Sequence, residues 1–307
     1  MRRHLIHRAV QALTVLLGVT LLTFVLLRIV PGNPVETMMG EHADAATVAR
    51  MTAEMGLDQP LHVQFFRYLS SAVRGDFGTS YSLGKPVSQL IGGAFVNTLY
   101  LALFAALFSW GLGIGCGILS ARYRNRWPDR LFTGFSLMGI SLPVFIAAMM
   151  LQYFLAFRLG LFPISGTDSA SGFVLPAAAL GWNSAGQIAQ ITRTSLMEAM
   201  GEDYIDTARS KGRGPAGVLM VHALRNAMLP VLTMMTLQFS TLLSGAVITE
   251  TVFSVNGIGR LMVQAISGRD IPLLQGTSLL ATAMVILGSL LADCLYSVLD
   301  PRIRKGA

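Results

Sequence analysis

The sequence predicts an all-α polytopic membrane protein with six transmembrane helices and both termini in the cytoplasm. Of its 307 residues, 53% are hydrophobic and only 13% are charged, whereas a soluble domain carries about 25% charged residues. Several apolar runs also reach the roughly 20 residues that a helix needs to cross the hydrocarbon core. The third observation is that Lys and Arg cluster in a few loops, and this clustering sets the orientation of the chain in the membrane.

Six apolar runs are predicted to span the membrane. They cover residues 9–27, 98–120, 131–157, 173–192, 228–249 and 273–292. The first run is long and lacks a small-residue cleavage pattern after it, so we expect a retained anchor and not a secretory signal. Three regions follow from these runs: residues 1–30 with the first span, an external and partly helical lobe at 31–97, and a five-helix core at 98–307.

Most of the 23 Lys and Arg residues lie in four segments. These are the amino terminus, the loop "ARYRNRWPDR", the segment 201–214 with its flanks, and the tail "DPRIRKGA". In a six-span chain all four lie on one side, and the positive-inside rule makes that side cytoplasmic. The net charge of +7 is therefore explained by contact with anionic membrane lipid, and we expect no nucleic-acid partner.

Two spans have unusual composition. The second contains "GLGIGCG", which lacks the preceding strand of a nucleotide-binding loop and is typical of close helix packing. The fourth is the least hydrophobic and carries the amides Asn183, Gln187 and Gln190. Such amides can simply bond neighbouring helices, but three of them beside a proline favour a face that lines a water-filled pathway.

The charged segment 201–214, "GEDYIDTARSKGRG", predicts a short amphipathic helix between two membrane helices. Its acids come first and its bases last, which complements a helix macrodipole. Tyr204, Ile205 and Ala208 share a small apolar face, and Gly212 is suited to end the helix. A solvated loop helix needs no aromatic residue, and a lipid-surface helix favours bases throughout its polar face. Docking on a protein partner is the favoured interpretation.

Two other classes of membrane protein are considered: an ion-coupled secondary transporter and an intramembrane enzyme. An ion-coupled secondary transporter usually keeps ionisable residues near mid-membrane, whereas Arg28, Glu250 and Asp293 lie at or near the span ends. An intramembrane enzyme would need catalytic or metal-binding residues, but the five histidines all lie outside the spans. Neither a metal-binding His pair nor a nucleophile turn occurs, so no catalytic or metal site is predicted.

The segment "DYIDTARSKG", followed by "HALRNAMLPV", resembles the EAA signature of ABC importer permeases. The chain as a whole is similar to the permease family of dipeptide, oligopeptide and nickel importers. The similarity extends through "RIVPGNP", "GLDQPL", "GDFGTS", "RLGLFPISG", "ETVF", "GRD" and "LDPRIR". The chain departs from the family in having Asp206, Thr207 and Ala208 as its triplet, and Val255-Asn256 in place of a Trp-Pro pair.

The resemblance implies the type I ABC importer transmembrane fold in a bacterial inner (plasma) membrane. It also implies that the segment 201–214 is a coupling helix that docks on an ATPase. The docking residues would be Tyr204, Ile205, Asp206, Thr207, Ala208, Lys211 and Gly212. A supporting cytoplasmic segment would comprise His222, Arg225, Asn226 and Pro230.

The implied partners are a second homologous permease subunit, two ABC ATPase subunits and an external substrate-binding protein. This chain has no phosphate-binding loop, so it is expected to be a pore subunit without an ATPase site and without a bound cofactor. ATP and Mg²⁺ would be used by the partner ATPases. Peptides, glutathione, nickel and metal chelates are cargo classes of the family, and "NRWPDRL" and "EDYIDTARSKG" most resemble glutathione and peptide permeases.

Overall fold

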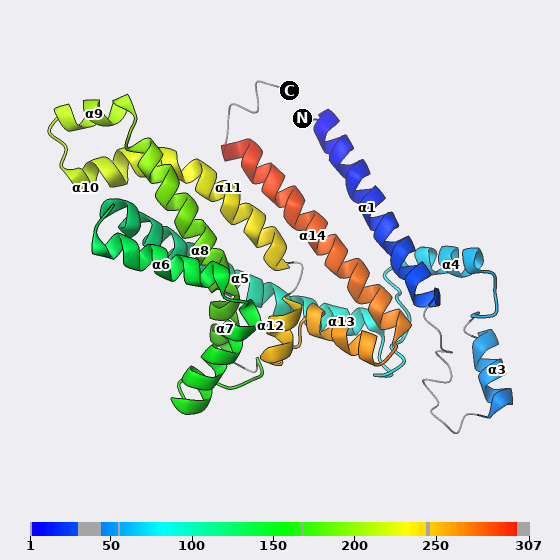
Figure 1. The fold of residues 1–307 in the computed structure, drawn as a ribbon. Helices are drawn as coiled ribbons and strands as arrows, with labels where there is room; N and C mark the ends of the chain where they lie inside the picture. Colours follow the sequence, from blue (N-terminus) through cyan, green and yellow to red (C-terminus); the bar gives the residue numbers. More distant parts are fainter. Residues whose placement is uncertain (1, 30–43, 55, 168, 244–245, 300–307) are drawn as a thin grey trace. The chain divides into compact units, whose positions relative to one another are not determined.

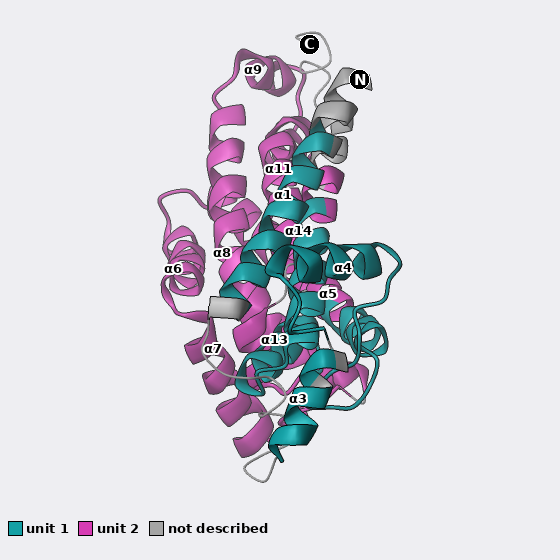
Figure 2. Ribbon diagram, turned by 90° about the vertical axis from the view of Figure 1, so that its right-hand side faces the viewer, with its two compact units in different colours: residues 1–98, 256–286 teal, residues 99–255, 287–307 magenta. Residues whose placement is uncertain are grey.

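A computed structural model describes the chain except residues 1, 30–43, 55, 168, 244–245 and 300–307. The tail and residues 31–43 of the expected external lobe thus lie outside the described residues. The described part is helical, with a single isolated bridge between Thr79 and Pro86 as its only β pairing. The chain divides into two compact units, residues 1–98 with 256–286, and residues 99–255 with 287–307 (Figure 2).

The first unit contains α1, α3, α4, α13 and parts of two long helices. The bounds are α1 Arg2–Ile29, α3 Ala45–Glu54, α4 Leu61–Val73, α5 Val87–Arg122 up to residue 98, α13 Ile258–Ser267, and α14 Ile271–Leu299 up to residue 286. Phe24 of α1 is buried and meets Phe65 of α4 edge to face, with ring centroids 5.3 Å apart. The described residues of the expected lobe thus include the helices α3 and α4.

Asp270 joins two segments of the first unit that are far apart in sequence. Its fully buried carboxylate accepts hydrogen bonds from Ser80 Oγ at 2.6 Å, from Ser82 Oγ at 2.8 Å and from the Ser82 amide at 2.9 Å. Burial alone would raise the pKa of Asp270, but these hydrogen bonds together lower it below the usual value. The motif "GRD" therefore fixes the loop that follows "GDFG" beside the start of α14.

The second unit is built around α8. Its elements are α6 Trp127–Ser141, α7 Val144–Leu151 with a π-helical continuation to Arg158, α8 Val174–Ala199, α9 Asp203–Ser210, α10 Pro215–Gly217 with a π-helical stretch to Ala223, α11 Leu224–Leu243, and α12 Val247–Val252. More than half of the residues of α8 are buried, and it packs against α6, α7 and α11. A central position explains why α8 tolerates so many polar side chains: it faces other helices.

Two of the predicted spans differ from the structure. The expected span 131–157 is broken between α6 and α7, which are bent by 108°. Leu142, at the break, is extended (ψ 124°) because the ring of Pro143 disfavours a helical residue before it and Pro143 has no N–H to donate. The expected span 228–249 ends as α11 at Leu243, and α12 begins separately at Val247.

Four described helices are long and apolar enough to cross a membrane, or five if the bent pair counts as one span. The four stretches are Val10–Leu27, Val87–Arg122, Pro215–Leu243 and Ile271–Leu291. The predicted fourth span, 173–192, does form a continuous helix in α8, but its amides and hydroxyls lower its hydropathy. These findings support a polytopic helical membrane protein, while the count of six remains an expectation.

Candidate functional site

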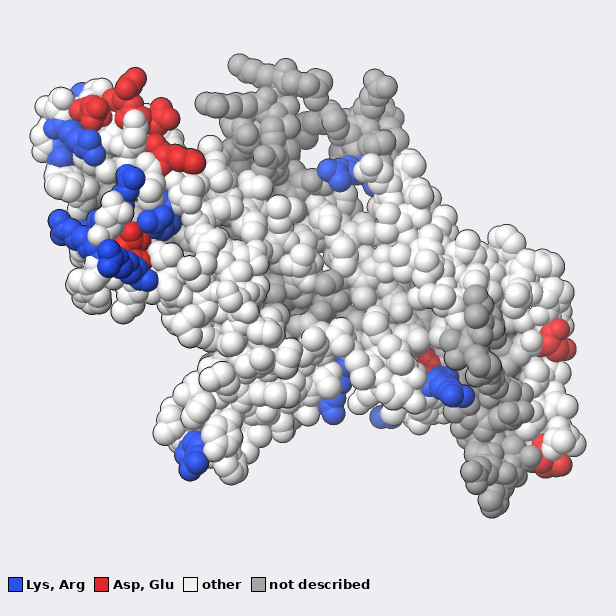
Figure 3. Space-filling view, viewed as in Figure 1, with Lys and Arg blue, Asp and Glu red and all other residues white. Residues whose placement is uncertain are grey.

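The segment predicted to be a docking helix forms α9, which lies across the ends of α8 and the α10–α11 stretch (Figure 1). Its first turn holds Asp203 and Asp206 and its last turn holds Arg209, an order that complements the helix dipole. Charged side chains gather over this end of the second unit, whereas most of the rest of its visible face is uncharged (Figure 3). The predicted mixed-charge helix is therefore present.

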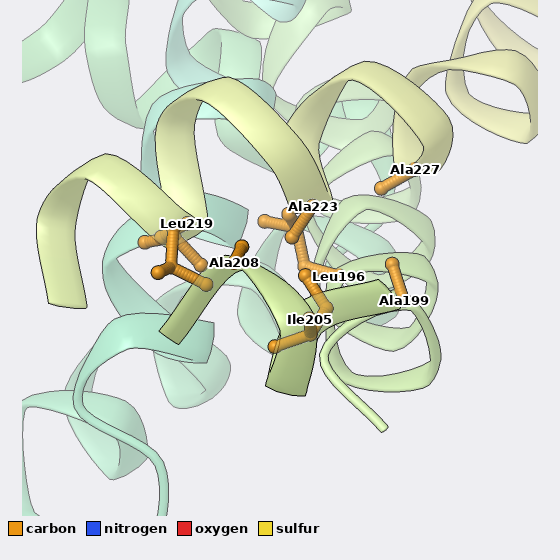
Figure 4. Close-up of a cluster of buried hydrophobic side chains, with 8 residues drawn as sticks. Leu196, Ala199, Ile205, Ala208, Leu219, Ala223 and Ala227 are labelled. Carbon is orange, nitrogen blue, oxygen red and sulfur yellow. The ribbon is translucent and has the colours of Figure 1, made fainter. Parts of the chain in front are cut away.

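α9 is held by an apolar cluster, which we call the seat. Ile205 is fully buried and Ala208 is 5% exposed. They pack among side chains from the end of α8 and from the stretch that leads into α11 (Figure 4). These are Leu196, Ala199, Val218, Leu219, Ala223 and Ala227. Because the cluster ties α9 to both neighbouring helices, a force on α9 acts on α8 and α11 together.

The seat corrects one expectation about the apolar face of α9. Ile205 and Ala208 are covered by the chain itself, so a partner would contact the opposite side of the helix. Tyr204 is 37% exposed, and Asp206, Thr207 and Lys211 are also exposed. Asp206 accepts a hydrogen bond from Arg209 at 2.9 Å, but this ion pair is largely exposed and contributes little to stability.

Gly212 ends α9 in a backbone conformation that suits glycine. Its φ is +78°, in the left-handed region that L side chains rarely adopt, and its N–H donates to the Arg209 carbonyl oxygen at 2.9 Å.

The Gly212→Pro variant is expected to insert normally but to transport poorly. Proline fixes φ near −65° and has no N–H, so the turn after α9 must change. Transport and ATPase activity of the purified complex measure the effect, and normal values for both would contradict the predicted role of this turn.

The predicted supporting segment lies where the π-helical stretch continues into α11. His222 is half-buried, and Arg225, Asn226 and Pro230 are exposed. The same segment instead contributes Ala223 and Ala227 to the seat, one turn apart, and α9 packs against the π-helical stretch that ends at Ala223. Sequence analysis missed these alanines, although their spacing of four residues is the signal that could have identified them.

The three amides of α8 do not share one role. Asn183 Nδ2 donates to the Gly139 carbonyl oxygen of α6 at 3.1 Å, and Gln187 Nε2 donates to Asn183 Oδ1 at 3.3 Å. Gln187 Oε1 accepts from Gln238 of α11 at 3.2 Å. Asn183 and Gln187 thus take part in bonding α8 to its neighbours, the structural role that sequence analysis left open. Gln190 is exposed and borders a small cavity.

The fold and the seat define a polytopic membrane transport subunit with a short charged helix held between two longer ones. Residues 113–305 match the family described as "Binding-protein-dependent transport system inner membrane component", and residues 1–102 match the description of its N-terminal region. The chain belongs to this family of ABC importer permease subunits, which are inner-membrane components with several membrane-spanning helices.

Curated relatives cover almost the whole chain. The "Glutathione transport system permease protein GsiC" of Salmonella paratyphi A (strain ATCC 9150 / SARB42) is 41% identical over 304 residues, 99% of each chain. The protein of the same name from Escherichia coli (strain K12) is 40% identical with the same coverage. The predicted resemblance to the peptide and nickel importer permeases is thereby confirmed.

Solved structures of similar fold are also ABC transporters. The inward-facing MetNI methionine ABC transporter has a chain with a TM-score of 0.60 and 18% identity, covering 69% of this chain and 97% of that one. A chain of an amino acid ABC transporter crystallised with histidines has a TM-score of 0.55, 17% identity, and coverage of 68% and 94%. At such identity the likeness concerns the fold alone, and it confirms the predicted type I importer transmembrane fold.

Proposed function

We propose that this permease subunit forms half of a translocation pathway for glutathione or a small peptide of similar size. The observation that carries the cargo class is the 40–41% identity to permeases of glutathione transport systems over 99% of both chains. Because the identity extends over the membrane-spanning helices, it includes the segments that would line the pathway. Family membership also decides against the ion-coupled secondary transporter considered from the sequence.

In this proposal α9 is the coupling helix and its exposed side docks on an ATPase subunit at the cytoplasmic face. ATP and Mg²⁺ act in two partner ATPases, since this chain has no phosphate-binding loop of its own. The seat supports the assignment because a helix fixed to both α8 and α11 can transmit motion to two helices of the core. A switch driven this way requires the ATPase to contact α9 differently in its two states.

The external face would receive a substrate-binding protein, and a second permease subunit would complete the pathway. The segments expected to meet the binding protein are the lobe at 31–97 and the stretch at 257–276. The described part of the lobe and this stretch belong to the same compact unit, and Asp270 bonds them together through Ser80 and Ser82. Because the two segments are hydrogen-bonded within one compact unit, they can present a single surface to the binding protein, which supports a docking role.

Reconstituting the complete complex in proteoliposomes tests the cargo. The inputs are both permeases, the ATPases and the native binding protein, with labelled glutathione outside and ATP inside. We expect glutathione uptake that requires ATP and the binding protein. Excess unlabelled glutathione should compete with this uptake, whereas nickel ions, the matched non-peptide control, should not. If nickel ions reduced the uptake of labelled glutathione and unlabelled glutathione did not, the cargo assignment would be overturned. Uptake without ATP would overturn the coupling assignment.

A further inference from the structure

The proposal concerns an ion pair in the second unit, formed by a buried carboxylate and a partly buried arginine that are not themselves members of the seat. Asp129, in the first turn of α6, is 5% exposed. Its carboxylate accepts two hydrogen bonds from Arg193 of α8, from Nε at 2.9 Å and Nη2 at 3.0 Å. The backbone N–H of Asn125, at 2.9 Å, and the hydroxyls of Ser120 and Thr133 also donate hydrogen bonds to this carboxylate. A bidentate pair of this kind fixes both distance and orientation.

The two helices are joined differently along their length. Midway, they touch closely: an added Cβ at Gly186 of α8 would lie 2.4 Å from the Ser136 carbonyl oxygen, and one at Gly139 of α6 would lie 2.8 Å from Trp182. Nearer to α9 a cavity of about 200 Å³ opens, lined in part by Ser120, Thr133 and Arg193. Beside this cavity the ion pair joins the end of α8 directly to the start of α6.

We propose that Asp129 and Arg193 are positioning residues that make the start of α6 follow the end of α8 when α9 moves. The inference rests on the proposed function, in which an ATPase moves α9. Arg193 lies within the last two turns of α8, three residues before the seat residue Leu196. The close contact at Gly186 acts as a fixed point, and the ion pair holds the two helices together on the α9 side of that point.

Spin labels on the complete complex measure this attachment directly. One label replaces Arg130 of α6 and the other replaces Glu198 of α8, both exposed, after Cys116 and Cys294 are changed to serine. With the ion pair intact we expect one narrow distance distribution. Asp129→Asn and Arg193→Gln are expected to broaden it, and Arg193→Lys, which keeps the charge but loses the bidentate geometry, should give an intermediate width.

The same variants without labels test the consequence for transport. We expect the ATPase subunits to stay bound and ATP hydrolysis to continue, while solute transported per ATP falls about tenfold, within the usual range of coupling between sites. Arg126→Gln is the matched control, because it removes the same charge from an exposed arginine beside α6. If Asp129→Asn does not insert, Arg193→Lys provides the same comparison.

An unchanged distance distribution in both Asp129→Asn and Arg193→Gln would overturn the proposal. Loss of bound ATPase in these variants would also overturn it, because the pair would then act on the seat. The spin-label result does not depend on the cargo. Failure of glutathione uptake by the unmodified complex would contradict the proposed function while leaving the attachment of α6 to α8 separately measured.

Discussion

Ala208→Glu is expected to leave the chain in the membrane but to abolish ATP-driven transport. Ala208 is 5% exposed and lies among Leu196, Val218 and Leu219 in the seat of α9. Placing an unpaired carboxylate there costs at least about 3 kcal/mol, more than a short helix held by one small cluster can withstand. α9 would leave its seat, and the surface proposed to meet the ATPase would no longer be fixed.

The measurement is the amount of ATPase subunit that copurifies with the variant permease, together with transport in proteoliposomes. Ala216→Glu is the matched control, since it makes the same substitution at an exposed alanine only eight positions along the chain. We expect the control to retain bound ATPase and transport. Normal copurification and normal coupling in Ala208→Glu would show that α9 is not the docking element.

Adding methyl groups at Gly113 and Gly117 is expected to destabilise the whole second unit. A Cβ at Gly113 would lie 2.8 Å from the Ala185 carbonyl oxygen, and one at Gly117 would lie 2.5 Å from Thr192 Cβ. Real Cβ atoms do not come so close, so α5 and α8 would have to separate. Overpacking of this kind costs about 1–3 kcal/mol at each site, and the double variant Gly113→Ala/Gly117→Ala should lose a large part of its thermal stability.

The same segment provides the control for this prediction. Gly111 and Gly115 alternate with the two close-contact glycines, and an added Cβ would meet nothing within 4 Å at either position. The double variant Gly111→Ala/Gly115→Ala should therefore match the unmodified protein in yield and thermal stability in detergent. Equal loss in both double variants would mean that helix flexibility, and not the close approach of α5 and α8, explains the glycines.

The glycine run shows how far a sequence pattern reaches. The composition of "GLGIGCG" was enough to predict close packing in a membrane, because small residues let helix backbones approach. It gave four candidate glycines with no means to choose between them. The choice depends on which side of α5 faces α8, and the structure answers that with the spacing of four residues between Gly113 and Gly117.

The amphipathic helix shows a different limit. Charge order and turn residues predicted α9 and its end at Gly212, because both are set by local backbone geometry. They could not reveal that Ile205 and Ala208 are buried in a cluster formed by the same chain. An apolar face looks the same in the sequence whether the chain or a partner buries it.

The sequence by itself therefore determined the membrane location, the helical class, the family and the place of the short charged helix α9. These properties follow from composition, local pattern and resemblance. Only the tertiary structure decided that Asn183 and Gln187 bond helices to each other, that Pro143 breaks a span, and that Asp129 pairs with Arg193 across 64 residues. Each of these depends on contacts between residues distant in the chain or on a bend in three dimensions, which no local pattern encodes.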